Sequence, residues 1–300
     1  MKERPLRFIV FSMHPLAYDL VREWIEENGH ELVLVVTTPG PSTRRNEDYK
    51  DLLAVLPIRQ EVLVTTRIRT IARPLIESIA PDMIFSFGFP YRIPPEIFGI
   101  PSIGTVNFHP APLPQYRGPN SIGRPVYDGW HELGGTLHWV DADIDTGRML
   151  AKETIPMPEP CTLESVIEDS VPMWRRVIHA GMEKALANEP GEPQDESQSS
   201  YAALFTEEET CLSWETPIEL LNRRIWSVNL VPPVTMKSEV GYASMEIEGV
   251  RHVIASSEIL NGKVSGKPAG SVIRSEGDLL IVQGLNGQLQ MNCSVVEAQE

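Results

Sequence analysis

The sequence predicts an α/β protein, in which a doubly wound (Rossmann-like) parallel-sheet domain is followed by a smaller β-rich C-terminal domain. Three observations lead to this fold class. Short, apolar, strand-like runs alternate with amphipathic helical segments through the first half of the chain, which is typical of parallel strands covered on both faces. A polar stretch at residues 189–200 then interrupts the pattern, and short strands separated by turn residues follow it.

The first half alternates strand and helix. Residues 7–12 form an apolar run between polar residues, which predicts a buried strand. Residues 15–28 carry apolar side chains at helical spacing, and Gly29 stands where a left-handed residue commonly ends a helix. The next elements follow in the same style, with strands at 31–38, 61–66 and 82–89 and a helix at 70–79.

A long helix is expected next, at residues 162–188, and Pro172 within it predicts a kink or break. The polar stretch after this helix indicates a linker or an exposed excursion. We therefore expect one domain over residues 1–190 and a second, β-rich and barrel-like, over residues 206–300.

The C-terminal part changes character. A helix is predicted at 213–228, and strands at 279–282 and 288–291 flank Asn286 and Gly287, a dipeptide favoured in tight hairpins. This pattern predicts a small module built mainly from antiparallel strands.

The composition is that of an ordinary soluble globular protein, with 42% hydrophobic and 22% charged residues. No apolar run is long enough to cross a membrane, and the start of the chain shows no secretory signal. The three cysteines are far apart and form neither a metal motif nor a disulfide framework. We expect a cytoplasmic protein without a metal site.

The net charge of −15 argues against nucleic acid as a partner, because a protein that grips a phosphate backbone usually carries a basic face. From residue 201 to residue 300 there are 7 Lys and Arg against 13 Asp and Glu. The overall field would therefore repel a polyanion such as transfer RNA.

Asn107, His109 and Asp145 are the candidate catalytic residues. Asn107 and His109 lie at the end of a strand-like run, and alternation along a strand sends both side chains to the same face. A carboxamide, an imidazole and a carboxylate can together polarise a carbonyl, carry a proton and orient the imidazole. The alternative is a buried polar pair that closes a strand, with Asp145 as a simple turn residue.

The surrounding motifs decide between these interpretations. Residues 107–120, 135–139 and 143–147 resemble, in order and spacing, the folate-dependent formyltransferases that act on methionyl-tRNA, glycinamide ribonucleotide and sugars. The resemblance is dense from residue 82 to residue 157. It implies that Asn107, His109 and Asp145 are a catalytic triad that moves a formyl group from N10-formyltetrahydrofolate to an amine. Asn107 and protonated His109 would donate to the formyl oxygen, while Asp145 would orient His109 and accept the proton of the amine.

The resemblance also implies which residues hold the cofactor. They come from two facing segments, namely Gly88, Phe89, Tyr91, Arg92, Ile93 and Pro94 in one and Asp141 and Ile144 in the other. His138 is interpreted as structural, because the family places its catalytic imidazole upstream. His14 is either a substrate contact or an exposed loop histidine.

The expected acceptor is a small-molecule amine. A nucleotide-linked amino sugar is the favoured one, and an amino acid is the next choice. The loop at residues 39–50 is short and mixed in charge, whereas methionyl-tRNA formyltransferases carry a longer basic loop there. Arg117 and its neighbours look closer to the sugar-modifying branch. Methionyl-tRNA formyltransferase, formyltetrahydrofolate hydrolase and a catalytically silent binding protein remain the alternatives, and a homodimer is among the expected assemblies.

Overall fold

The computed structural model describes residues 4–39, 48–159, 161–230, 242–260 and 262–295. Residues 40–47, most of the loop from which the acceptor was argued, lie outside the described residues. The chain forms two compact units, and each is made from three stretches of sequence. Unit 1 comprises Met1–Ser121, Leu133–Ile155 and Glu168–Tyr201, and unit 2 comprises Ile122–Glu132, Pro156–Ile167 and Ala202–Glu300.

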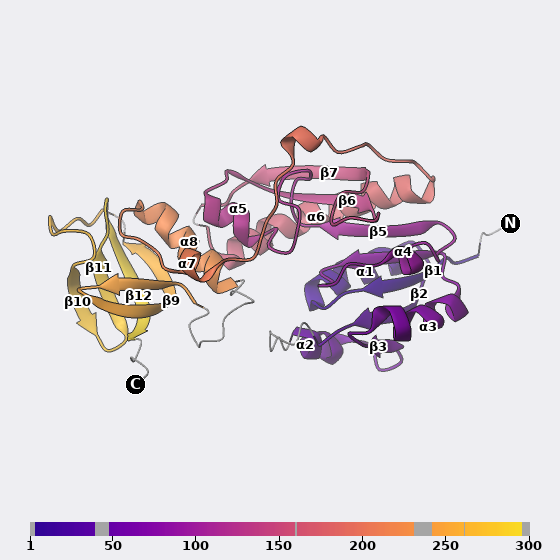
Figure 1. Cartoon of the computed structure of the whole chain (residues 1–300), viewed down its shortest axis with the longest axis horizontal. Helices are drawn as coiled ribbons and strands as arrows, with labels where there is room; N and C mark the ends of the chain where they lie inside the picture. The colour runs from indigo at the N-terminus through magenta and orange to yellow at the C-terminus, as the bar shows by residue number, and fades with distance from the viewer. Residues whose placement is uncertain (1–3, 40–47, 160, 231–241, 261, 296–300) are drawn as a thin grey trace. The chain divides into compact units, whose positions relative to one another are not determined.

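Unit 1 is built on a seven-stranded sheet with the order β3-β2-β1-β4-β5-β6-β7 (Figure 1). Its strands are β1 (Arg7–Phe11), β2 (Glu31–Thr37), β3 (Val62–Val64), β4 (Met83–Phe87), β5 (Gly104–His109), β6 (Glu132–Trp139) and β7 (Met149–Pro156). The strands from β3 to β5 are parallel, so the predicted doubly wound sheet is confirmed. β6 runs antiparallel to β5, which the strand–helix alternation does not foretell.

Helices cover this sheet, and β4 is consequently buried at every position. They are α1 (Pro15–Glu27), α2 (Asp48–Val55), α3 (Arg73–Ile79), which a π-helical turn at Ile68–Ala72 precedes, α4 (Pro95–Phe98) and α6 (Leu163–Leu186). α1 begins with Pro15 in its first turn, and Gly29 after its end has φ of 68°, as predicted. α6 continues past Pro172, so of the predicted kink or break the break does not occur.

The strand order reverses between β1 and β4, and such a point at the carboxyl edge of a parallel sheet is where ligands bind. The chain leaves β4 through Gly88, whose φ of 67° favours glycine. A Cβ there would also meet the Cδ2 atom of His14 at 2.7 Å. The neighbouring strand β5 ends at the same edge with His109. The fold therefore brings the candidate residues to the expected place.

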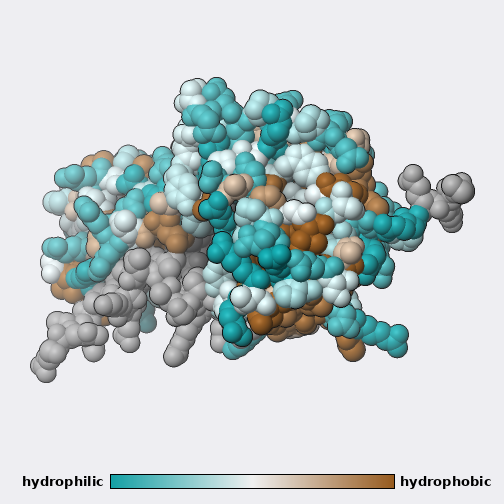
Figure 2. Space-filling model, turned by 45° about the vertical axis from the view of Figure 1, so that its right-hand side comes forward, coloured by the Kyte–Doolittle hydropathy of each residue, from teal (hydrophilic) through white to brown (hydrophobic). Residues whose placement is uncertain are grey.

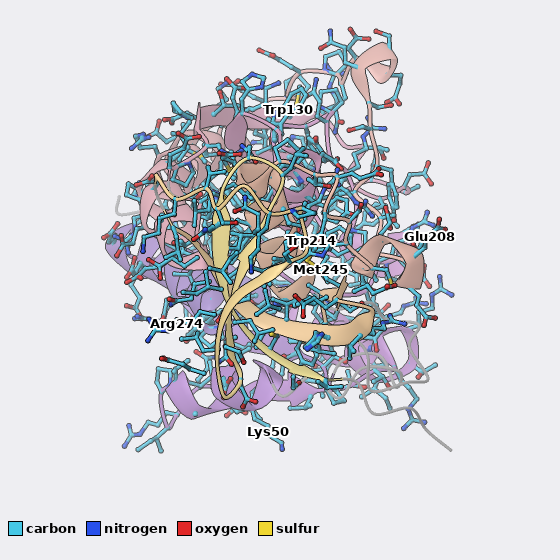
Figure 3. The ribbon with its side chains drawn as sticks, turned by 90° about the vertical axis from the view of Figure 1, so that its left-hand side faces the viewer. Lys50, Trp130, Glu208, Trp214, Met245 and Arg274 are labelled. Carbon is cyan, nitrogen blue, oxygen red and sulfur yellow. The ribbon has the colours of Figure 1, made fainter. Side chains whose placement is uncertain are left out.

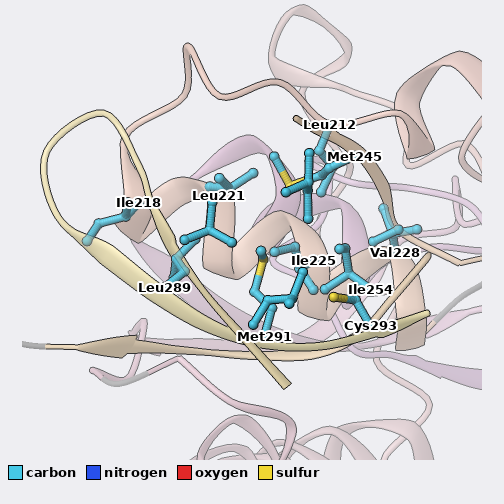
Figure 4. Close-up of a cluster of buried hydrophobic side chains, with 14 of the residues drawn as sticks. Leu212, Ile218, Leu221, Ile225, Val228, Met245, Ile254, Leu289, Met291 and Cys293 are labelled. Carbon is cyan, nitrogen blue, oxygen red and sulfur yellow. The ribbon is translucent and has the colours of Figure 1, made fainter. Parts of the chain in front are cut away.

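Unit 2 contains a five-stranded antiparallel sheet with the order β10-β11-β12-β9-β8, which confirms the predicted β-rich module. Its strands are β8 (Ser244–Ile247), β9 (Val250–Leu260), β10 (Val272–Glu276), β11 (Leu279–Gln283) and β12 (Gln288–Val295), and its helices are α5 (Gly123–Asp128), α7 (Glu207–Thr210) and α8 (Ile218–Leu230). Figure 4 shows α8 directing Leu221 and Ile225 toward Leu289 and Met291 of β12, which forms the core of the unit.

The hairpin between β11 and β12 differs from the predicted tight turn. Its loop has four residues, closed by a hydrogen bond from the N–H of Gly284 to the carbonyl of Gly287. The Asn286 carboxamide is used elsewhere, because its oxygen accepts from the N–H of Ile218 at 2.9 Å and caps α8. Trp214, which lies near Met245 in Figure 3, donates its indole N–H to the carbonyl of Glu246 on β8. These two contacts hold the first residue of α8 and the segment before it against the sheet of unit 2.

The visible face in Figure 2 is mainly hydrophilic, with smaller hydrophobic areas between the polar residues. Among the described residues, no helix is both long enough and apolar enough to cross a membrane.

Candidate active site

Asn107 and His109 lie on the same face of β5, as the alternation predicts. His109 is buried, while Asn107 is half-buried. Both side chains point to Asp145. The Asn107 Nδ2 atom donates to Asp145 Oδ1 at 3.3 Å, and His109 Nδ1 lies 3.4 Å from Asp145 Oδ2. The structure therefore brings the three residues together from positions up to 38 residues apart in the sequence.

Asp145 is held in an unusual place. Its φ of 55° lies in the left-handed region, which few side chains other than asparagine and aspartate adopt. Its Oδ2 atom accepts from the N–H of Gly118 at 2.9 Å. Two residues later, a Cβ on Gly147 would lie 1.6 Å from the carbonyl oxygen of Trp139, so only glycine fits there. The predicted tight turn thus presents a carboxylate that is mostly buried, rather than one at an open edge.

Burial and charge act in opposite directions on Asp145. Burial raises the pKa of this carboxyl, but the protonated forms of His109 and His138 and the N–H of Gly118 outweigh burial and hold the pKa below its usual range. Asp145 is therefore a carboxylate at neutral pH.

The imidazole of His109 faces two acceptors. Its Nε2–H donates to the carbonyl oxygen of Tyr116 at 2.8 Å, and its Nδ1 faces Asp145. Burial lowers the pKa of His109, while the Asp145 carboxylate and the Tyr116 carbonyl oppose this shift. Burial therefore opposes the protonated ring, whereas the carboxylate that faces Nδ1 favours it. Such a group is suited to accept a proton transiently and return it.

His138 belongs to this cluster, and the interpretation that it is merely structural missed these contacts. It lies directly across from Asn107 in the antiparallel β5–β6 pair, so both side chains share one face. Its Nδ1–H donates to the carbonyl of Trp139 at 2.8 Å, which leaves Nε2 to accept from Asn107 Nδ2 at 3.1 Å. His138 Nε2 is also 3.6 Å from Asp145 Oδ1. A parallel sheet was expected, whereas the observed register of the antiparallel β5–β6 pair puts these two residues opposite one another.

The contacts of the cluster fall into a short and a long group. The backbone partners, Tyr116 and Gly118, lie 2.8–2.9 Å from His109 and Asp145. The contacts of Asp145 with the Asn107, His109 and His138 side chains measure 3.3–3.6 Å. Long contacts between catalytic groups are common before a substrate binds. The donors of Asn107 and His109 therefore point at protein acceptors, and a substrate oxygen would compete with the longer of these contacts.

The expected cofactor residues divide into buried and accessible ones. Ile93 and Pro94 are buried, the latter at the start of α4, and Phe89 packs edge-on against Phe11 at 5.0 Å between ring centroids. These residues support the turn after β4. Gly88 shapes the same turn through its positive φ.

The remaining residues of that set are more accessible. Tyr91 is half-buried, while Arg92 and Ile144 are exposed. Arg92 lies 3.5 Å from the carboxylate of Asp143, so the two expected segments meet. Asp141 has an internal role, because its Oδ1 accepts from Thr146 Oγ1 at 2.6 Å within the turn that carries Asp145.

An open cavity of about 470 Å³ lies beside the turn after β4. It is lined by Thr66, Arg67, Ile68, Arg69, Thr70, Tyr91 and Arg92. Sequence reasoning found only the last two of these residues, because the others come from the segment after β3, which carries no motif. Three guanidinium groups around one cavity suit an anionic group.

The described part of the chain contains no group of three or more His, Cys, Asp or Glu able to hold a metal ion. His14 stands at the end of β1, half-buried beside Gly88, and thus faces the turn after β4 rather than bulk solvent alone.

Known proteins resemble the chain along most of its length. The methionyl-tRNA formyltransferase of Thiobacillus denitrificans is 26% identical over 292 residues, which are 95% of this chain and 90% of that protein. That of Moorella thermoacetica is 27% identical over 270 residues, or 87% of this chain and 82% of that protein.

Solved structures show the same fold at lower identity. HypX from Aquifex aeolicus, in complex with tetrahydrofolic acid, superposes with a TM-score of 0.68 at 18% identity, over 96% of this chain and 44% of the HypX chain. This chain thus spans less than half of the HypX chain. An N-formyltransferase from Helicobacter canadensis gives a TM-score of 0.62 at 15% identity, over 97% of this chain and all of that one. The formyl transferase family model matches residues 6–171, which include all three candidate residues and most of unit 1. The chain therefore belongs to the formyl transferase family.

Proposed function

We propose that the protein transfers a formyl group from N10-formyltetrahydrofolate to the primary amine of a small molecule, with a nucleotide-linked amino sugar as the favoured acceptor. The observation that carries the reaction type is the contact of Asn107, His109 and Asp145 around one buried carboxylate in a chain of this family. We assign all three as catalytic residues.

His109 and Asp145 form the proton-handling pair. Neutral His109 takes the proton that the attacking amine must lose, and Asp145 stabilises the imidazolium that results across the 3.4 Å contact. The Tyr116 carbonyl holds the other ring proton, so the charged ring has an acceptor at each nitrogen. Asn107 supplies an amide donor for developing negative charge when its 3.3 Å contact with Asp145 exchanges for a substrate oxygen.

The cofactor would supply the electrophilic formyl carbon. Its glutamate carboxylates suit the cavity that Arg67, Arg69 and Arg92 line, and Tyr91 offers an aromatic wall. Tetrahydrofolate in the complex of the HypX relative supports this choice of cofactor. Replacing Arg67 and Arg69 together with methionine should raise the KM for the formyl donor with little change in kcat. Arg73→Met, which removes an exposed ion pair on α3, should leave both unchanged.

Charge favours a small acceptor. The chain carries a net charge of −15, and its C-terminal hundred residues also have an excess of acidic groups. The N-formyltransferase from Helicobacter canadensis, which superposes over 97% of this chain, is named in complex with an amino sugar nucleotide, dTDP-3-aminofucose. An acceptor of this kind needs a small polar pocket and no extended basic surface.

Methionyl-tRNA is the second candidate acceptor, and the sequence relatives favour it. The relatives with 26–27% identity over most of the chain are named methionyl-tRNA formyltransferases. Binding of this acceptor would require phosphate contacts, so transfer to it should weaken steeply with salt.

An acceptor screen decides between the two. Purified protein is incubated with N10-formyltetrahydrofolate and either amino sugar nucleotides, amino acids or charged initiator tRNA, and released tetrahydrofolate is followed by absorbance. We expect turnover with an amino sugar nucleotide that is insensitive to salt between 50 and 200 mM, a range in which phosphate-dependent binding falls by about 10³–10⁵. Efficient, salt-sensitive formylation of the tRNA would refute the small-molecule proposal.

Hydrolysis of the cofactor is tested in the same assay without an acceptor, since the same residues could direct water. Acceptor-independent release of formate as fast as any transfer would identify a hydrolase. Failure to bind the formyl donor in calorimetry would instead indicate a catalytically silent protein.

A further inference from the structure

The segment of residues 190–201 forms hydrogen bonds along its length with other parts of unit 1. The backbone groups of Glu192 and Met149 exchange two hydrogen bonds of 2.8 Å. Further along, Ser200 accepts from the N–H of Arg117 through its carbonyl at 3.0 Å and from the N–H of Tyr116 through its hydroxyl at 2.8 Å. The sequence suggested a linker or an exposed excursion here. The segment is exposed over most of its length, and it ties together the two loops that carry the active-site contacts.

Gln194 lies in the middle of this segment and uses its whole carboxamide. Its Nε2 atom donates to the carbonyl oxygens of Asp145 and Gly147, both at 2.8 Å. Its Oε1 atom accepts from Arg117 Nε at 3.0 Å and from Arg117 Nη2 at 2.7 Å. One side chain thereby joins the backbone of the Asp145 turn to the guanidinium of Arg117.

Arg117 is fixed in turn. Its side chain is only 10% exposed, and Glu196 pairs with it through two contacts of 3.0 and 2.7 Å. The residues on either side of Arg117 hold the reacting groups, since the Tyr116 carbonyl accepts from His109 and the Gly118 N–H donates to Asp145. The same short loop therefore contacts both members of the proton-handling pair.

The backbone of Asp145 needs such support. A non-glycine residue with φ of 55° is strained and persists where its surroundings fix it. Gln194 bonds to the carbonyl of that residue, and Gly118 bonds to its carboxylate. The two contacts hold Asp145 from the backbone side and from the side-chain side.

We propose that Gln194, itself held by Arg117, is a positioning residue that sets the place of the Asp145 carboxylate against His109. Its effect on turnover rests on the proposed function, whereas its effect on the geometry does not. Without its two amide donors the Asp145 turn would relax, and the long contact between Asp145 and His109 would be lost first.

Three variants separate this role from general packing. Gln194→Met keeps the length of the side chain and removes all its hydrogen bonds. Gln194→Glu keeps an oxygen for Arg117 but removes the donors to the Asp145 turn. Gln198→Met alters a glutamine of the same segment that is exposed and bonds to Asp195, and it is the matched control.

Loss of an outer contact that orients a reacting group typically costs about 10–100-fold in activity. We expect this loss in kcat for both Gln194 variants, with the KM for the formyl donor within twofold of the wild type and with unchanged kinetics in Gln198→Met. A normal kcat in Gln194→Glu would overturn the proposal, because the donors to the Asp145 turn would then be dispensable. A raised KM at unchanged kcat would also overturn it.

A measurement without turnover completes the test. The His109 ring is titrated by NMR in the wild type and in the variants, with its signals assigned by comparison with His109→Ala. The pKa of His109 should be lower in both Gln194 variants, because the carboxylate that raises it has moved, and unchanged in Gln198→Met. Identical titration in all four proteins would refute the positioning role. If the wild type transfers no formyl group, the proposed function fails, and this titration still decides the role of Gln194.

Discussion

Replacing Asp145 with asparagine should disable the site while keeping the shape of the side chain. The carboxylate accepts from Gly118 through Oδ2 and from Asn107 through Oδ1. An asparagine has one oxygen, so in either orientation its NH₂ group faces one of these two donors. His109 also loses the carboxylate that would stabilise its protonated form.

Two magnitudes follow. General acid–base assistance contributes about 10²–10⁴-fold to a rate, and we expect kcat of Asp145→Asn to fall within this range. The buried donor that is left without an acceptor costs about 1–3 kcal/mol of folding free energy. For a domain of about 200 residues this corresponds to a drop in Tm of about 2–4 °C per kcal/mol.

The stability difference should also depend on pH. The pKa of Asp145 is depressed in the folded protein, so its stabilising contribution is fully present above the unfolded-state value of about 3.9. The contribution is lost as the pH falls through the folded-state pKa. The gap in unfolding free energy between wild type and Asp145→Asn should thus be largest near neutral pH and shrink below about pH 4.

Turnover with the accepted amine and calorimetric unfolding between pH 3 and pH 7 measure both effects. Asp169→Asn, which removes an exposed carboxylate of α6, controls for the lost charge. A kcat within tenfold of the wild type, or a stability gap that stays constant down to pH 3, would show that the carboxylate does not act as we describe.

His109→Ala should lower kcat by at least about 10²-fold, and Asn107→Ala by about 10²–10³-fold, in the same transfer assay; near-normal turnover of either would remove that residue from the mechanism. Asp82→Asn should lower the unfolding free energy by about 1–3 kcal/mol in denaturant titrations. The hydrogen bond from Arg4 is the largest of the contacts that lower the pKa of Asp82 to about 2. The difference in unfolding free energy between wild type and Asp82→Asn should therefore vanish as the pH falls to about 2, and a difference that persists there would contradict this role. Leu221→Ala empties a fully buried position of unit 2 and should cost about 2–5 kcal/mol, and a cost below 1 kcal/mol would contradict the packing of this core.

Periodicity was enough to predict most of the parallel sheet, whereas the candidate triad needed the resemblance to a known family. β1 and β4 are apolar along their length and are buried on both faces, so the apolar run by itself predicts a buried strand. Strand alternation placed Asn107 and His109 on one face of their strand, whereas their assignment as a triad with Asp145 came from the resemblance to the folate-dependent formyltransferases.

Pairwise geometry could not be predicted in this way. His138 meets Asn107 through the antiparallel register of β5 and β6, and this register could not be read from the sequence of either strand. Gln194 lies in a stretch of polar residues that resembles a linker. Its hydrogen bond to the distant backbone of Asp145 produces no periodic pattern in the sequence, so the contact could not be predicted. The loop at Asn286 was expected to be a tight turn, but the Asn286 side chain caps α8, a contact between distant parts of the sequence that local turn preferences do not reveal.

The threading of the chain limits how this protein can be divided. Unit 2 takes Ile122–Glu132 from between β5 and β6 and Pro156–Ile167 from the junction of β7 and α6. Tyr127 of the first stretch packs against Phe205 with ring centroids 4.8 Å apart. A gene fragment that stops at residue 201 would therefore carry α5 without Phe205, against which it packs, and a fragment that starts there would lack α5 altogether. Exchange of the C-terminal part between relatives by a single crossover would leave this helix mismatched. Recombinants should work only when the two inserts are transferred together with the tail.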